Sequence, residues 1–172
     1  MRGTDGYFHN TTASVSVNHF ISDKWNNTFR SSHDNRDSAA QNFYTTFISD
    51  TATEKVTSLW KHLHLGYKAT KHSFTFDAGY KSVKDHFLYN NKSTTNENKS
   101  NLLQGLAVHN YQPSEKISIT TGANWISKQI TSNDSGNHTC SQLAGFATLN
   151  HLAAKNFYVN PAIRAKWTES IG

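Results

Sequence analysis

Alternation of apolar and polar residues is the strongest pattern along this chain. In the segment 116–125, the odd-numbered positions from Ile117 to Trp125 are Ile, Ile, Thr, Ala and Trp, and the even-numbered ones from 118 are Ser, Thr, Gly and Asn. A period of two predicts a β-strand with one apolar and one polar face. The pattern recurs in 73–81 and 157–167, and in shorter form in 13–18.

Polar breaks of two lengths separate the strand-like segments. The short breaks are 22–24, 68–71, 113–115 and 153–155, and the long ones are roughly 33–54, 84–100 and 131–138. Because short and long breaks strictly alternate, we predict about eight up-and-down strands with tight turns at one end and loops at the other. Outer-membrane barrels have this asymmetry. Counting 42–47 as a further strand would break the alternation, so we assign it to the 33–54 excursion.

Three details qualify the predicted sheet. Pro161 lacks a backbone N–H, so we expect the last strand to contain a bulge or a local break in pairing. Lys61 falls on the apolar face of its strand and is expected near a membrane rim, where its ammonium group can reach water. The apolar face of 101–112 and of 139–151 stays undecided, since both parities contain apolar residues.

Composition agrees with a two-faced sheet. Only 35% of residues are hydrophobic and the mean hydropathy is −0.67, yet charged residues make up just 17% and aromatics 12%. No stretch approaches the roughly 20 apolar residues of a transmembrane helix. The first residues lack the apolar core of a signal peptide. Because an outer-membrane protein needs such a peptide, we expect either that the protein is cytoplasmic or that its natural N-terminus is missing.

The chemistry-bearing residues give little support for catalysis. The chain has no nucleophile elbow, no His-Glu-x-x-His motif and no phosphate-binding Gly-rich loop, so we expect neither an enzyme nor a cofactor. The net charge of +5 is dispersed, which argues against nucleic acid as a partner. His62 and His64 share one strand face without a third metal ligand in sight, so polar lining is favoured over a metal. Asp77 and Lys81 are expected to pair.

Four segments resemble TonB-dependent receptors, specifically the cobalamin-receptor-like group of Bacteroidetes. They are Arg36–Phe47, Asp77–Lys81, Ser132–Thr139 and Asn160–Arg164, and the resemblance spans roughly residues 7–169. It implies an all-β fold: a section of an antiparallel, up-and-down transmembrane barrel of 22 strands, or an open curved sheet when isolated. The chain has no plug segment and too few strands, so we expect residues 1–172 to be one partial barrel domain.

The resemblance also implies a function. The chain would form part of the wall of an outer-membrane transporter for a scarce ligand such as cobalamin or a siderophore. Its partners would be outer-membrane lipid, the receptor's own plug and remaining strands, the small ligand and, through the plug, TonB. Within the chain, Asn42, Phe43 and Tyr44 are the candidates for ligand contact. Arg30, His62 and His64 are the candidates for lining the lumen.

Two other readings stay open. Eight strands can close into a complete small outer-membrane barrel with a structural or adhesive role. A soluble β-sandwich or lipocalin-like binding protein is also compatible with the alternation, provided that the apolar faces meet in one core. That reading does not explain the alternation of loop lengths.

Overall fold

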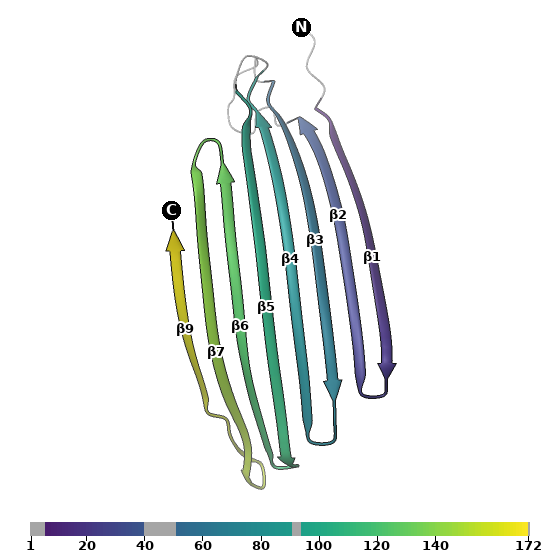
Figure 1. Cartoon of the computed structure of the whole chain (residues 1–172), viewed down its shortest axis with the longest axis vertical. Helices are drawn as coiled ribbons and strands as arrows, with labels where there is room; N and C mark the ends of the chain where they lie inside the picture. Colours follow the sequence, from purple (N-terminus) through teal and green to yellow (C-terminus); the bar gives the residue numbers. More distant parts are fainter. Residues whose placement is uncertain (1–5, 40–50, 91–93, 172) are drawn as a thin grey trace.

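The computed structural model describes residues 6–39, 51–90 and 94–171, and these form a single antiparallel sheet (Figure 1). No helix in this part of the chain is long and apolar enough to cross a membrane. The strands are β1 (Phe8–Ser22), β2 (Trp25–Ala39), β3 (Thr53–Lys68), β4 (His72–Leu88), β5 (Asn96–Ser114), β6 (Ile117–Ser132), β7 (Gly136–Ala154), β8 (Phe157–Val159) and β9 (Ala162–Ile171).

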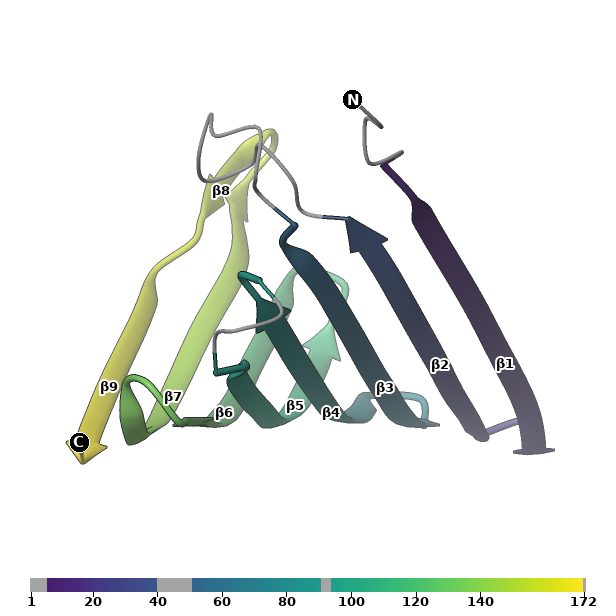
Figure 2. The ribbon, with the colours of Figure 1, turned by 90° about the horizontal axis from the view of Figure 1, so that it is seen from above.

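Each strand pairs with the next one along the chain. The order runs from β1 to β8, and β9 continues the hairpin by pairing with β7. β1 and β9 lie at opposite sides of the sheet (Figure 2) and do not pair with each other within the described residues. The all-β, up-and-down class predicted from the sequence is therefore confirmed, as an open sheet.

The ninth strand arises from Pro161. Residues 160 and 161 lie outside the ladder and separate β8 from β9, although both strands pair with β7. The carbonyl of Pro161 still accepts a hydrogen bond of 3.0 Å from the Leu149 N–H, but its ring nitrogen has no hydrogen to return one. The predicted interruption of the last strand is thus present.

The loops are shorter than predicted. Residues 33–39 and 53–54 belong to β2 and β3, and β4 and β5 occupy most of 84–100. In both hairpins the polar residues continue the backbone ladder past the alternating segment. Polar composition therefore did not mark the end of the strands, since a backbone ladder needs no apolar side chains to satisfy its N–H and C=O groups.

The strand register sorts the side chains onto two faces, because directly paired residues point to the same side. One row joins Phe29, Leu63, Ala78, Gly105, Trp125, Leu143 and Trp167 across the sheet. We call this side the apolar face and the other the polar face. The register also decides the two undecided segments: the odd-numbered residues of 101–112 and 139–151 lie on the apolar face.

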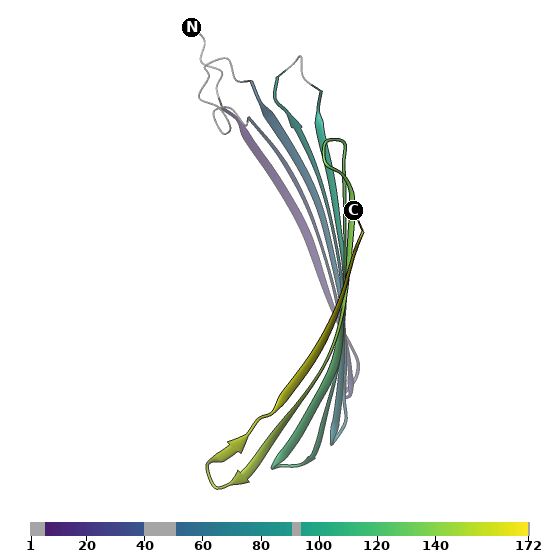
Figure 3. The ribbon, with the colours of Figure 1, turned by 90° about the vertical axis from the view of Figure 1, so that its left-hand side faces the viewer.

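The strands are inclined to the line of their turns. The row that starts at Trp25, beside the β1–β2 turn, reaches β7 at Ala147, eight residues before Lys155 of the β7–β8 turn. Trp25 is one residue from its turn and Ala147 is eight residues from its turn, so the row moves about seven residues away from the turn end between β2 and β7. Over these five strand spacings, that displacement corresponds to a strand inclination of roughly 44°. Transmembrane barrels have tilts of about 35–45°. The sheet also curves and twists along its length (Figure 3).

The sheet is one layer thick and has almost no core. Ala52 and Ala144 are the only buried hydrophobic residues in the described chain, and β1 and β9 are exposed along their whole length. A soluble domain buries its apolar surface between two or more layers. Here nothing within the described chain covers either face.

Candidate functional site: a sheet with two faces

Aromatic residues mark two levels of the apolar face. Trp25, Tyr67 and Phe74 lie together near the tight turns, with ring centroids 4.7 Å apart for Trp25–Tyr67 and 6.2 Å apart for Tyr67–Phe74. Tyr80 and Trp125 lie farther toward the loops, and both are exposed. Aromatic residues at both ends of an apolar band are typical of membrane-spanning sheets, whose band is about 25 Å tall. Phe74 and Tyr80 are six residues apart on β4, which at this inclination spans about 14 Å.

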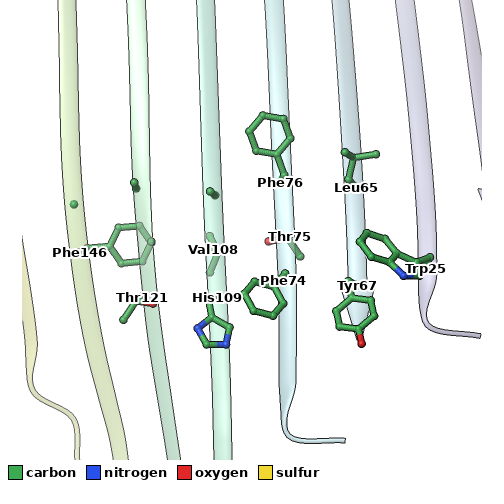
Figure 4. A pocket seen from close by; sticks show the side chains of 14 residues that line it. Trp25, Leu65, Tyr67, Phe74, Thr75, Phe76, Val108, His109, Thr121 and Phe146 are labelled. Atoms are coloured by element: carbon green, nitrogen blue, oxygen red, sulfur yellow. The ribbon is translucent and has the colours of Figure 1, made fainter. Parts of the chain in front are cut away.

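A hollow of about 720 Å³ opens among the aromatic residues at the turn end (Figure 4). Bulky residues such as Trp25 and Phe76 stand beside small ones, Ala107, Ala123 and Gly145, and the difference in size creates the depression. Its lining is mainly apolar. The surface is therefore suited to contact with hydrocarbon rather than with a polar ligand.

Lys61 is the main exception on this face. It lies directly opposite Tyr80 of the loop-side aromatic level, and Leu59 separates it from the polar Thr57. Its flexible stem can carry the ammonium group toward the polar end of the strand. The register thus places Lys61 at the loop-side aromatic level, and its position near a membrane rim stays a prediction.

The polar face is linked across its strands by side-chain hydrogen bonds. Thr12 on β1 and Ser58 on β3 both donate to the Asp34 carboxylate on β2, at 2.7 and 3.1 Å. Farther toward the loops, Arg36 donates to Glu54 at 3.0 Å and forms an ion pair with it.

Arg30, His62 and His64, the predicted lumen residues, all lie on the polar face. Arg30 and His62 occupy the same row on β2 and β3. The structure adds Asp77 of β4, whose Oδ1 atom lies 3.1 Å from His62 Nε2 and 2.8 Å from His64 Nδ1. We call these three side chains the His–Asp cluster. All of them are less than one-third exposed.

The expected pairing of Asp77 with Lys81 is wrong. Residues four apart on one strand face are separated by about 13 Å, which is too far for an ion pair. Asp77 instead pairs across to β3, where the register sets it opposite His64. Sequence reasoning missed this partner because the β3–β4 register could not be read from the sequence; the carboxylate simply lies far from both histidines along the chain.

Metal binding and ligand contact are the other two site predictions. Within the described residues, no group of three or more His, Cys, Asp or Glu side chains has an arrangement that could hold a metal ion. Asn42, Phe43 and Tyr44, the predicted ligand contacts, lie outside the described residues.

The fold and its faces define a class. A single up-and-down sheet of long, inclined strands, apolar on one side, polar on the other and open at both edges, is a segment of the wall of a large antiparallel β-barrel.

Comparisons with known proteins agree on this fold. No family model matches the chain, and no curated protein matches it in sequence. Among solved structures, the ferric enterobactin receptor PfeA of Pseudomonas aeruginosa superposes with a TM-score of 0.79 at 10% identity, covering 94% of this chain and 29% of the receptor. The siderophore receptor PirA of the same species gives a TM-score of 0.72 at 13% identity, covering 94% and 28%.

A third similar structure is the outer-membrane transporter YddB of Escherichia coli, with a TM-score of 0.70 at 8% identity over 92% of this chain and 27% of the transporter. The chain thus spans less than a third of each of these three proteins. The named neighbours are receptors and a transporter rather than enzymes. At such low identity the likeness establishes the barrel-wall fold.

Proposed function

We propose that this chain is part of the wall of a TonB-dependent outer-membrane transporter, and that it has no catalytic role. The observation that carries the proposal is the uncovered apolar face of a one-layer sheet whose two edge strands lack partners within the described residues. Lipid would cover the apolar face, and further strands would pair with β1 and β9. A complete small barrel would instead need β1 and β9 to pair with each other.

The proposed orientation follows from the loop lengths. The tight turns would face the periplasm and the longer connections the exterior, as in other bacterial barrels. The polar face would then look inward, and Arg30, His62 and His64 would line the lumen toward a plug domain. Asn42, Phe43 and Tyr44 would contact the ligand from the long β2–β3 connection.

The ligand class is the finer part of the proposal. We favour a scarce compound such as a siderophore or a cobalamin, taken up with energy delivered through TonB. The similar solved structures include a siderophore receptor and a ferric enterobactin receptor, which supports a siderophore. The sequence resemblance supports a cobalamin. Uptake of both labelled ligands in cells with and without TonB would discriminate between them.

Adjacent cysteine substitutions on β4 test the proposed placement in the membrane. Thr75 lies on the polar face and Phe76 on the apolar face of the same strand. In the whole protein, with Cys140 changed to Ser, we expect Thr75→Cys to react with a water-soluble maleimide added to permeabilised outer membranes. Phe76→Cys should react only with a membrane-permeant reagent.

Equal labelling of both positions by the water-soluble reagent would contradict a lipid-facing apolar surface. Fractionation supplies an independent check, since the protein should appear in the outer-membrane fraction. Recovery in the soluble fraction would favour the lipocalin-like alternative.

A further inference from the structure

Two lysines face each other on the apolar side of the sheet, beyond its apolar band. Lys84 of β4 and Lys99 of β5 are directly paired in the register, and both are exposed. Within the described residues, neither ammonium group has a carboxylate at ion-pair distance. Like charges placed directly opposite each other destabilise a strand pair. An anion between them would remove that cost.

A hollow of about 510 Å³ lies at these two lysines. Thr131 and Asn137 continue the row of Lys84 and Lys99 onto β6 and β7, and both also line the hollow. Hydroxyl and amide groups add uncharged hydrogen-bond donors to the two ammonium groups. We call this surface the outer basic hollow.

The other charged groups near the hollow leave a positive excess. Glu97, which also lines it, has its carboxylate 3.4 Å from the His86 imidazole. In the next row toward the loops, Lys55 lies opposite Asp37, so the positive charge of Lys55 is offset by the negative charge of Asp37. Lys84 and Lys99 together therefore outweigh Glu97 even when His86 is neutral.

The hollow lies just beyond the apolar band. Lys84 follows Tyr80 of the loop-side aromatic level by four residues on the same strand face. On a strand inclined by about 40°, the ten residues from Phe74 of the turn-side aromatic level to Lys84 rise about 25 Å along the membrane normal, which is the height of the apolar band of an outer-membrane barrel. The headgroup layer extends roughly 5–7 Å beyond the hydrocarbon. The two lysine side chains can therefore reach headgroup phosphates from above.

We propose that the outer basic hollow binds the phosphate of a lipid headgroup in the outer leaflet. Lys84 and Lys99 would bridge the phosphate, and the acyl chains would run down the apolar face. A lipid is favoured over free phosphate because the hollow opens outward, on the same face as the apolar band. The inference rests on the proposed function, which places that face in the membrane and the loops outside.

The test uses the whole protein, purified from outer membranes in a non-ionic detergent, and lipid A as the probe. Binding is measured by native mass spectrometry across a lipid titration. The double variant Lys84→Gln/Lys99→Gln should weaken binding at least tenfold. Lys81→Gln/Lys128→Gln is the matched control, because it removes the same charge from two lysines on the polar face, where they share a row with Leu102 between them.

The control variant should keep its affinity within about twofold, and dephosphorylated lipid A should not discriminate among the three proteins. Equal losses in both double variants would overturn the proposal, since general charge attraction would then explain binding. Full competition by millimolar inorganic phosphate would identify a free-phosphate site instead. Different mobilities of unheated and boiled samples in SDS gels verify that each variant is folded.

Failure of this proposal is distinguishable from failure of the proposed function. If the protein fractionates with outer membranes and Thr75→Cys and Phe76→Cys label as expected, but lipid A binds all variants equally, only the headgroup site is wrong. If the protein is absent from outer membranes, the transporter proposal itself is wrong.

Discussion

Asp77 joins two histidines that the chain holds only two residues apart. Its Oδ1 atom accepts from both rings, so one carboxylate fixes the orientation of His62 and His64 on the polar face. His62 also stacks on Trp60, with ring centroids 5.7 Å apart. The cluster is therefore positioned by cross-strand contacts and not by the local sequence.

Replacing Asp77 should loosen the sheet at this point. We expect Asp77→Ala to lower the free energy of unfolding by about 1–2 kcal/mol, because both imidazoles lose their acceptor in a partly buried setting. Urea denaturation in detergent, followed by tryptophan fluorescence, measures the change. Asp85→Asn is a matched control on the same strand face, since Asp85 Oδ1 has no partner in the described structure. An equal loss in the control would contradict the role given to Asp77.

At Gly122, neighbouring atoms leave no room for a side chain. A Cβ atom there would collide with the Phe146 ring and lie 2.8 Å from the Ala107 carbonyl oxygen. We expect Gly122→Val to destabilise the protein by about 1–3 kcal/mol through overpacking. Gly105→Ala, at a position where nothing lies within 4 Å, should change the stability by less than about 0.5 kcal/mol. Thermal unfolding of both variants provides the comparison.

At the scale of the secondary-structure elements, the conformation of the tight β7–β8 turn depends on one residue with a positive φ. Asn156, in the β7–β8 turn, has a φ of 64°, the only positive φ of a non-glycine residue in the described chain. Asn tolerates this left-handed conformation better than most residues. The turn and the Pro161 break together isolate β8, which is only three residues long. This hairpin is therefore the weakest ladder of the sheet.

The Asn156 turn gives a prediction at this scale. Asn156→Val should cost about 1–2 kcal/mol, because a β-branched residue is strained at positive φ. Asn156→Gly should be nearly neutral. Hydrogen exchange of the amides in β8 would report the difference as faster exchange in the Val variant alone. Identical protection in both variants would show that the turn conformation does not limit the hairpin.

At the scale of the whole molecule, the sheet leaves an apolar face and two strand edges uncovered within the described residues. Large hydrophobic side chains on the apolar face, such as Phe76, Trp125 and Trp167, are between 41% and 62% exposed. The backbone groups on the free edges of β1 and β9 have no strand beside them in the described sheet. Such a sheet needs a cover for its apolar face and neighbouring strands at its edges to be stable.

The isolated 172-residue chain should therefore aggregate in water. We expect large β-rich particles in size-exclusion chromatography and light scattering at micromolar concentration, because edge pairing and apolar contact both favour association. Detergent micelles should reduce the particle size by covering the apolar face. A monodisperse monomer in plain buffer would contradict the need for lipid and further strands, and would favour a soluble carrier.

Much of the fold could be predicted from the sequence alone. The period of two identified the apolar residues of 73–81 and 116–125, and the alternation of turn lengths gave the up-and-down order. These features are local, since they depend on which face each residue occupies and on where turn residues interrupt the pattern. Pro161 likewise predicted a break in the strand, because proline cannot donate a backbone hydrogen bond at any position in a ladder.

The register between strands was decided only by the tertiary structure. It fixed the apolar face of 101–112 and 139–151, brought Asp77 to His62 and His64, and set Lys84 opposite Lys99. A slip of one residue would send every side chain of a strand to the other face, and the sequence of a single strand does not contain its partner's alignment. The contacts between strands are therefore determined by the tertiary structure, whereas the apolar and polar faces of each strand are determined by its own sequence.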